Sequence, residues 1–405
     1  MSAVFLVGDI GGTNSRFSLF EVSGVEDDIR KHHALYSENF KNEGFDHFAA
    51  VVTQFLNEAS KVLGRHVRPT SACFAVAGPV TNDRVSFTNR NAWIIDGREL
   101  ELSLDIPAVV LVNDFQANGY GVLTLKEEEY CVIQEASPNY SAPIACIGAG
   151  TGLGECFLTP SAGRYEAWPS EGGHVEFAPL SDLHSELLTF LTKKFNSNRV
   201  SVERVVSGKG LENIYEFLRE KFPEDINPIH DERILKAVEG ARLIGSLVYD
   251  DKLCGMAMEI MFELYGSEVG NVALKYLPYG GIYICGGIAP KNIERLRDLN
   301  CNFMKSFKNK GRVSPQLARI PVYVVLVEDL GLRGAHLVAY RLWRDGKTSM
   351  EDEVKPGSLD SMLFFSSQGR QKTVQWFNYA LACSCGAAVA SSLLYLLHRF
   401  SYSKG

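Results

Sequence analysis

The chain has 405 residues, of which 46% are hydrophobic and 22% are charged, and its formal net charge is −7. This length and apolar content suffice for more than one buried core, and the negative charge argues against a nucleic-acid-binding surface. The nine cysteines are scattered and include no C-x-x-C pair, so we expect buried free thiols in a reducing compartment rather than zinc or a disulfide framework.

The first strong pattern is an apolar run, Val4–Val7, that leads into Gly8-Asp9-Ile10-Gly11-Gly12-Thr13-Asn14 before alternation resumes at Phe17. Strand, glycine turn and strand are typical of a β-hairpin. Adjacent glycines leave backbone N–H groups open to a phosphate, and Thr13 and Asn14 add side-chain donors. Asp9 is placed to hold water or Mg²⁺ near that phosphate, although a plain hairpin is the alternative. Because the run ends at Asp9 without a preceding basic segment, we expect no signal peptide.

The next elements predict an α/β arrangement. Apolar residues at helical spacing run from Phe48 to Ala59, and a strand is predicted over 71–77. The continuous apolar run 107–112 suits a buried parallel strand, whose carboxyl end presents Asn113 and Asp114. Because Asn and Asp also favour turns and helix caps, a plain strand-ending turn is the alternative for this pair.

A second glycine-rich turn, Gly148 to Gly154, separates strands predicted at 144–147 and 156–158. It lacks the Lys-Ser/Thr of a P-loop and opens no helix, so it is neither a Walker A motif nor a dinucleotide fingerprint. A third turn, Gly286-Gly287, follows another apolar strand and precedes a helical stretch over 292–299. Three such turns in one chain favour nucleotide binding. Further helices are predicted at 185–195, 210–221, 235–247 and 255–277.

These motifs, in this order and at this spacing, resemble the bacterial-type glucokinases of the sugar kinase, actin and Hsp70 superfamily. The resemblance runs from residue 4 to about residue 343 and also includes Thr88-Asn89, Glu171-Gly172-Gly173-His174 and the Ser201–Val205 segment. It implies a two-lobed, actin-like (ribonuclease H-like) α/β fold with the active site in the interdomain cleft. The implied domains are a small one at 1–124, completed by a helix at 330–344, and a large one at 125–329.

The resemblance also implies a set of site residues. Asp114 would be the catalytic base, and the glucose ligands would be Asn89, Asn113, Asp114, Glu171, His174 and Glu203. The nucleotide would contact Gly8, Asp9, Gly11, Gly12, Thr13, Asn14, Gly150, Thr151, Gly152, Gly286 and Gly287, with Asp9 near Mg²⁺. From the residues alone, two other interpretations stand: a metal site at His174 and Glu176, and a first-turn helix acid at Glu203 behind a Ser201 cap.

The implied activity is that of an ATP-dependent glucokinase with Mg²⁺, which makes glucose 6-phosphate at the first step of glycolysis. The alternatives are a kinase for another hexose, such as mannose or an amino sugar, and a non-catalytic sugar sensor; ADP and polyphosphate are alternative donors. A cytoplasmic catalytic body is expected, and a homodimer is expected from the resemblance alone.

The C-terminal part lies outside the resemblance. Residues 345–369 read as a linker, and residues 370–405 form a hydrophobic tail in which 373–397 contain no charged residue. That stretch is long enough to span a bilayer and carries aromatic residues toward both ends, which would tether the catalytic body to an organelle membrane. Its many small residues equally suit a core or dimer-interface helix.

Overall fold

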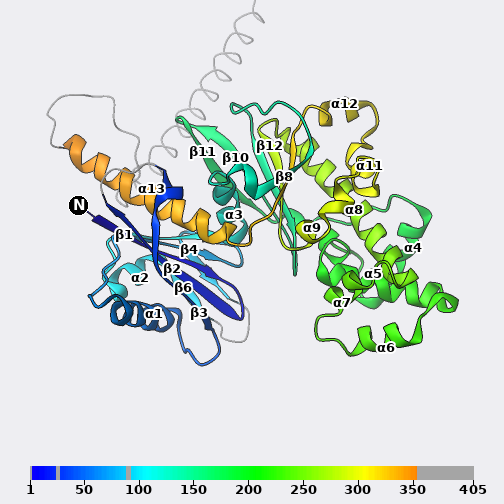
Figure 1. The fold of residues 1–405 in the computed structure, drawn as a ribbon, viewed down its shortest axis with the longest axis horizontal. Coiled ribbons are helices and arrows are strands. Elements are labelled where there is room, and N and C mark those ends of the chain that lie inside the picture. The colour runs from blue at the N-terminus through cyan, green and yellow to red at the C-terminus, as the bar shows by residue number, and fades with distance from the viewer. Residues whose placement is uncertain (1, 24–27, 88–92, 354–405) are drawn as a thin grey trace, which may run out of the picture. The chain divides into compact units, whose positions relative to one another are not determined.

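The computed structural model describes residues 2–23, 28–87 and 93–353. Residues Met1–Trp343 form one compact unit, and Arg344–Gly405 form a second. The first unit is built on two mixed β-sheets with helices against them (Figure 1). The chain is thus a two-lobed α/β fold, as the sequence predicts.

The first sheet has the strand order β3-β2-β1-β4-β7, with β1, β4 and β7 parallel and β2 and β3 antiparallel. Its strands are β1 (Ser2–Ile10), β2 (Asn14–Ser23), β3 (His33–Lys41), β4 (Ser71–Val76) and β7 (Val109–Asn113). Helix α1 (Phe48–Leu63) turns its apolar positions, among them Val51 and Phe55, into one core layer of this lobe. A second layer joins Phe5 and Val7 to Ala335 and Tyr340 of α13 (Leu330–Glu353). The strands are apolar on both sides because both layers are buried.

The second sheet repeats this order of strands and adds one at its edge: β11-β10-β9-β12-β13-β8. Its strands are β8 (Tyr130–Gln134), β9 (Ile144–Ala149), β10 (Leu153–Ser161), β11 (Arg164–Ser170), β12 (Gly281–Cys285) and β13 (Val322–Val325). Here β9, β12 and β13 are parallel, as β1, β4 and β7 are in the first sheet. The turn between β9 and β10 therefore occupies the place that the turn between β1 and β2 occupies in the first sheet.

Helices cover the second sheet, with α8 (Lys252–Tyr276) at the centre of the larger core. Buried residues lie all around α8, as expected of a helix enclosed by others. The other elements are β5 (Arg84–Ser86), β6 (Ile94–Asp96), α2 (Gly97–Leu104), α3 (Asp114–Val122), α4 (Asp182–Lys194), α5 (Gly208–Lys221), α6 (Pro228–Lys236), α7 (Gly240–Ser246), α9 (Ile288–Lys291), α10 (Ile293–Leu296), α11 (Asn302–Lys308) and α12 (Ser314–Leu317).

The helices predicted at 235–247 and 292–299 are wrong in extent. The first is divided, because α6 ends at Lys236 and Ala237 turns to an extended conformation. The Glu212 carboxylate then accepts a hydrogen bond from the Ala241 N–H (3.0 Å) and so satisfies the first turn of a new helix. The second is reduced to the single turn of α10, which follows α9 directly.

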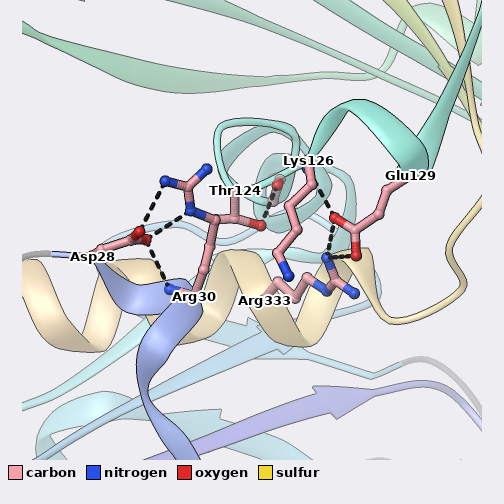
Figure 2. Close-up of polar contacts among 7 residues, drawn as sticks. Asp28, Arg30, Thr124, Lys126, Glu129 and Arg333 are labelled. Carbon is pink, nitrogen blue, oxygen red and sulfur yellow. Dashed lines mark hydrogen bonds and ion pairs between the residues drawn. The ribbon is translucent and has the colours of Figure 1, made fainter.

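Helix α13 links the two lobes. Its Arg333 guanidinium donates to both carboxylate oxygens of Glu129 (2.8 Å each), on the connection that leads from α3 to β8 (Figure 2). The Lys126 N–H donates to the same carboxylate (2.9 Å). The helix extends to Glu353, beyond Asp345, where the sequence predicts a linker. Across the described ranges, none of the helices has the length and apolar content needed to cross a membrane.

Candidate active site

Two glycine turns stand at corresponding places in the two sheets, and both are held by hydrogen bonds. In the first, the Gly11 N–H donates to the Asn14 carbonyl (2.9 Å), and the Asn42 side-chain amide donates to the Gly11 carbonyl (2.8 Å). In the second, the Gly150 N–H donates to the Gly152 carbonyl, and the Gly208 N–H donates to the Gly150 carbonyl (2.8 Å each). The exposed residues of these turns are Gly12, Thr13, Asn14 and Thr151.

A cavity of about 410 Å³ brings four of the predicted residues together: Asp9, Asp114, Gly286 and Gly287. Its lining comes from both lobes and from the start of α13. Among the described residues, the two turns and the predicted glucose ligands of the second lobe are not part of this lining. A larger but shallower depression of about 640 Å³ runs along α8 and contains no predicted site residue, so the smaller cavity is the better candidate.

Asn113 and Asp114 stand where β7 meets α3. The Asn113 side-chain oxygen Oδ1 caps the helix by accepting from the Phe115 and Gln116 N–H groups (2.9 and 3.1 Å), and the side-chain NH₂ donates to the Gly78 carbonyl (3.1 Å). The cap predicted as an alternative is therefore present. It positions Asp114 at the first residue of the helix, in the cavity.

The Asp114 carboxyl is electrostatically unusual. Its pKa is raised to about 6, chiefly by burial, with smaller contributions from the nearby carboxylates of Asp9 and Glu171, while a hydrogen bond from the Phe115 N–H (2.8 Å) opposes the rise. A carboxylate with such a pKa accepts a proton more readily than an exposed one. The influence of Glu171 also shows that Asp114 lies within electrostatic reach of the second lobe.

Asp9 lies near the carboxyl end of β1, opposite Arg16 on β2. Burial raises its pKa, and the Arg16 charge opposes this effect. Its carboxyl carbon is 3.8 Å from the position that a Cβ at Gly331 would occupy, at the start of α13. A carboxylate that faces a cavity offers the oxygen ligands that Mg²⁺ prefers. Gly8, by contrast, is buried, and a Cβ there would lie 2.8 Å from the Phe74 ring, so the structure places it in the core.

Glu171, His174 and Glu203 are brought together although 32 positions in the numbering separate the first from the last. The His174 ring lies between the two carboxylates: Nε2 is 3.8 Å from Glu171 Oε2, and Nδ1 is 3.9 Å from Glu203 Oε1. The other Glu203 oxygen accepts from the Leu153 N–H (3.0 Å), directly after the second glycine turn. This polar cluster therefore adjoins the second glycine turn.

The sequence also allowed Glu203 to be a first-turn helix acid and His174 and Glu176 to form a metal site. Glu203 does lie in a first helical turn, the 3₁₀ turn at Val202–Arg204, but the Ser201 side chain makes no capping hydrogen bond there. Glu176 pairs with Arg199 (3.1 Å) rather than with His174. Within the part of the chain that the structure describes, no group of three or more His, Cys, Asp or Glu side chains is arranged to hold a metal ion. Asn89 lies outside the described residues.

The cavity also contains residues that the sequence analysis does not single out: Asn118, Lys291, Glu328 and Gly331. Asn118 follows Asp114 by four positions on α3, and this spacing puts both on one helix face. Lys291 follows Gly287 by the same spacing. Helical spacing from a predicted site residue could therefore have indicated both Asn118 and Lys291. Glu328 and Gly331 approach the cavity only because α13 returns to the first lobe.

Comparison with known proteins identifies the family. The glucokinase family profile matches residues 6–342. A glucokinase of Nostoc sp. is 41% identical over 351 residues, which cover 84% of this chain and 99% of the relative. The crystal structure of a glucokinase from an Antarctic psychrotroph has a TM-score of 0.69 and 28% identity, covering 84% of this chain and 99% of that one.

A ROK family glucokinase from Streptomyces griseus, whose structure contains glucose and AMPPNP, shares the fold at a TM-score of 0.53 and 18% identity, covering 84% of this chain and all of that one. The profile match and the extent of the identity decide the assignment: the chain belongs to the glucokinase family.

Proposed function

We propose that this glucokinase transfers the γ-phosphoryl group of ATP to the 6-hydroxyl of glucose, with Asp114 as the general base. The observation that carries the assignment is the buried Asp114 carboxyl, whose pKa is raised to about 6 in the cavity that it shares with Asp9, Gly286 and Gly287. A sugar hydroxyl is a weak nucleophile at neutral pH and needs such a base within hydrogen-bond reach.

In the proposed reaction, the Asp114 carboxylate takes the proton of the 6-hydroxyl while the hydroxyl oxygen bonds to the γ-phosphorus. The bond from that phosphorus to the bridging oxygen breaks, and its electron pair leaves with ADP. Glu171, His174 and Glu203 would bind the other sugar hydroxyls, because carboxylates accept and imidazole both accepts and donates hydrogen bonds. The Gly11–Asn14 and Gly150–Gly152 turns would hold phosphate oxygens through backbone N–H groups.

The donor set of the cavity fits a magnesium ion that accompanies ATP. Asp9 supplies a carboxylate whose pKa burial raises, which indicates that its negative charge lacks full compensation from Arg16. Asp9 would hold Mg²⁺ directly or through water, and the ion would neutralise charge on the β- and γ-phosphates.

The test is an ADP-release assay on the full chain with ATP and Mg²⁺, run with glucose, mannose, fructose and N-acetylglucosamine. Turnover with glucose at a kcat/KM well above that of the other sugars is the expected result. Preference for another sugar would change the substrate. Glucose binding without turnover, with ATP, ADP or polyphosphate as donor, would favour the sugar-sensor alternative.

For the rest of the chain, we propose a cytoplasmic catalytic body tethered to a membrane through residues 373–397. The absence of charged residues in this stretch supports the tether, and the family match ends before it, at residue 342. Residues 354–405 lie outside the described structure.

A homodimer is proposed from the family resemblance alone, and light scattering of the purified protein tests it.

A further inference from the structure

The proposed reaction does not use the buried carboxyl of Glu155. This carboxyl lies beside the turn that carries Glu171 and His174, two of the proposed glucose ligands. Glu155 is on β10 and is only 2% exposed. Among the described residues, its Oε1 atom has no hydrogen-bond partner. Buried acids are normally paired because removing a charge from water costs several kcal/mol, so an unpaired one indicates a protonated group or a functional one.

The turn that carries Glu171 and His174 lies directly against this carboxyl. A Cβ at Gly172 would clash with the Glu155 carboxylate, and a Cβ at Gly173 would clash with the Leu153 carbonyl. Both clashes involve β10, so the turn touches this strand with its backbone. The Gly172 N–H donates to Ser170 Oγ (3.0 Å), and Ser170 is the residue opposite Glu155 in the β10–β11 ladder.

The charged groups around Glu155 come mainly from α8. Glu268 is buried (4% exposed), and its Oε1 is 3.7 Å from Lys275 Nζ. Lys310 bonds to the neighbouring Ser267 and Asn271 of α8 and acts on Glu268 rather than on Glu155. The strands on either side place Ile147 and Ser170 opposite Glu155, and neither ionises.

These effects together place the midpoint of Glu155 ionisation near neutral pH, where both the protonated and the ionised form are present. The pKa of Glu155 is raised to about 7, chiefly by burial and also by the Glu268 charge, against the opposing effect of Lys275. The neutral acid can stay beneath the turn, whereas the carboxylate is stabilised by contact with water. Because the backbone of Gly172 lies against the Glu155 carboxylate, movement of the turn away from β10 would give water access to it.

We propose that Glu155 is a positioning residue for glucose, whose protonated form lets the Gly172–Gly173 turn lie against β10 and whose ionised form displaces the turn. This inference rests on the proposed role of Glu171 and His174 in binding the sugar. Glucose then binds the protonated enzyme more tightly, so glucose binding takes up a proton near neutral pH, and the KM for glucose rises with pH.

The test compares the full-length protein with Glu155→Gln, which has the shape of the protonated acid and does not ionise. The KM for glucose and kcat are measured from pH 6 to pH 9, and proton uptake is measured by calorimetry in buffers of different ionisation enthalpy. In the parent, KM should rise as the pH increases. The total rise should be about tenfold for each unit by which bound glucose raises the Glu155 pKa, and kcat at saturating glucose should not change over the same pH range. In Glu155→Gln, this rise and the associated proton uptake should be absent.

Two further variants sharpen the result. Glu268→Gln removes the like charge and should move the rise in KM to lower pH. Glu239→Gln, at an exposed position on the surface, should leave the parent profile intact. Glu171, His174, Glu203 and Asp114 are present in all three variants, so the difference between parent and Glu155→Gln isolates Glu155.

An unchanged KM profile in Glu155→Gln would overturn the proposal, as would a KM raised equally at every pH. Failure of the proposed function would look different, because the parent would then not phosphorylate glucose at any pH.

Discussion

Asp114 is held at the start of α3 by the cap that Asn113 provides, and its environment raises its pKa. Replacement of Asp114 by Asn keeps the shape and an acceptor oxygen but removes the base. We expect kcat to fall by at least about a hundredfold, with the dissociation constant for glucose little changed. A coupled assay and calorimetry measure the two quantities.

The matched control is Asp105→Asn, at an exposed carboxylate of the same lobe, which should retain parental kcat. Near-native turnover of Asp114→Asn would remove Asp114 from the mechanism.

The raised pKa of Asp114 also sets an acid limit on activity. The base must be ionised to accept a proton, and the raised pKa means that protonation begins at a higher pH than for an exposed aspartate. We therefore expect kcat/KM to fall about tenfold per pH unit below about pH 6 and to level off above it. The pH profile of kcat/KM checks this limb, and a profile that stays flat down to pH 4 would contradict it.

Single residues differ in how far the sequence reveals them. Gly286-Gly287 and Asn113-Asp114 follow apolar runs that predict buried strands, and the carboxyl ends of such strands are where open α/β sheets bind ligands. Glu155 gives no such signal, because one acid in an apolar strand does not reveal whether a partner faces it. The contact of His174 with both Glu171 and Glu203 likewise depends on the folding of β10 against two separate turns.

Helices α3 and α13 cross at backbone distance, and glycine makes the crossing possible. A Cβ at Gly334 would clash with the Ala117 carbonyl of α3, and a Cβ at Gly121 would clash with the Leu330 carbonyl of α13. Because α3 begins at Asp114 and the start of α13 lines the same cavity, this crossing helps to position the Asp114 carboxyl, the proposed general base.

Replacement of Gly334 by Ala should therefore separate the two helices. Overpacking of this kind costs about 1–3 kcal/mol, so we expect a lower thermal midpoint together with a reduced kcat. Gly346→Ala is the control in the same helix, because the position is exposed and, among the described residues outside its own helical turns, no heavy atom lies within 4 Å of the Cβ position. It should leave kcat unchanged and stabilise the helix slightly. Equal behaviour of the two variants would show that the crossing tolerates a methyl group.

The division of the predicted helix at 235–247 illustrates the limit of periodicity. Both halves have helical patterns, so the pattern does not show the interruption. The contact between the Glu212 carboxylate and the Ala241 N–H joins residues 29 apart in the chain, and it begins α7 where the local sequence offers no side-chain cap. Contacts at this distance are absent from any local pattern.

Across the molecule, the recurring strand order of the two sheets places the turn of Gly11–Asn14 and the turn of Gly150–Gly152 at corresponding positions. The resemblance to glucokinases predicts two lobes with a site between them, and a cavity lined from both lobes agrees with that expectation.

The C-terminal tail provides a prediction for the whole chain. Deletion of the residues after Gly369 should leave kcat and the KM for glucose unchanged, because the family match and the compact unit Met1–Trp343 both end before it. If residues 373–397 anchor the protein, the truncated form should leave the membrane fraction, which fractionation of expressing cells measures. Full-length protein found entirely outside the membrane fraction would contradict the anchor, and lost activity in the truncated form would show a structural role for the tail.

The sequence by itself determined the strands and turns that carry the chemistry, because turn residues, apolar runs and helix caps act over a few positions along the chain. These local patterns indicated Asp9 and the three glycine turns, and the resemblance to glucokinases added the role expected of Asp114. Only the tertiary structure decided which of these residues share a cavity, that Gly8 is buried in the core, and that Glu155 Oε1 has no hydrogen-bond partner among the described residues, beneath the turn that carries Glu171 and His174. Burial and proximity, which set pKa values and binding geometry, arise from packing between segments far apart in the chain.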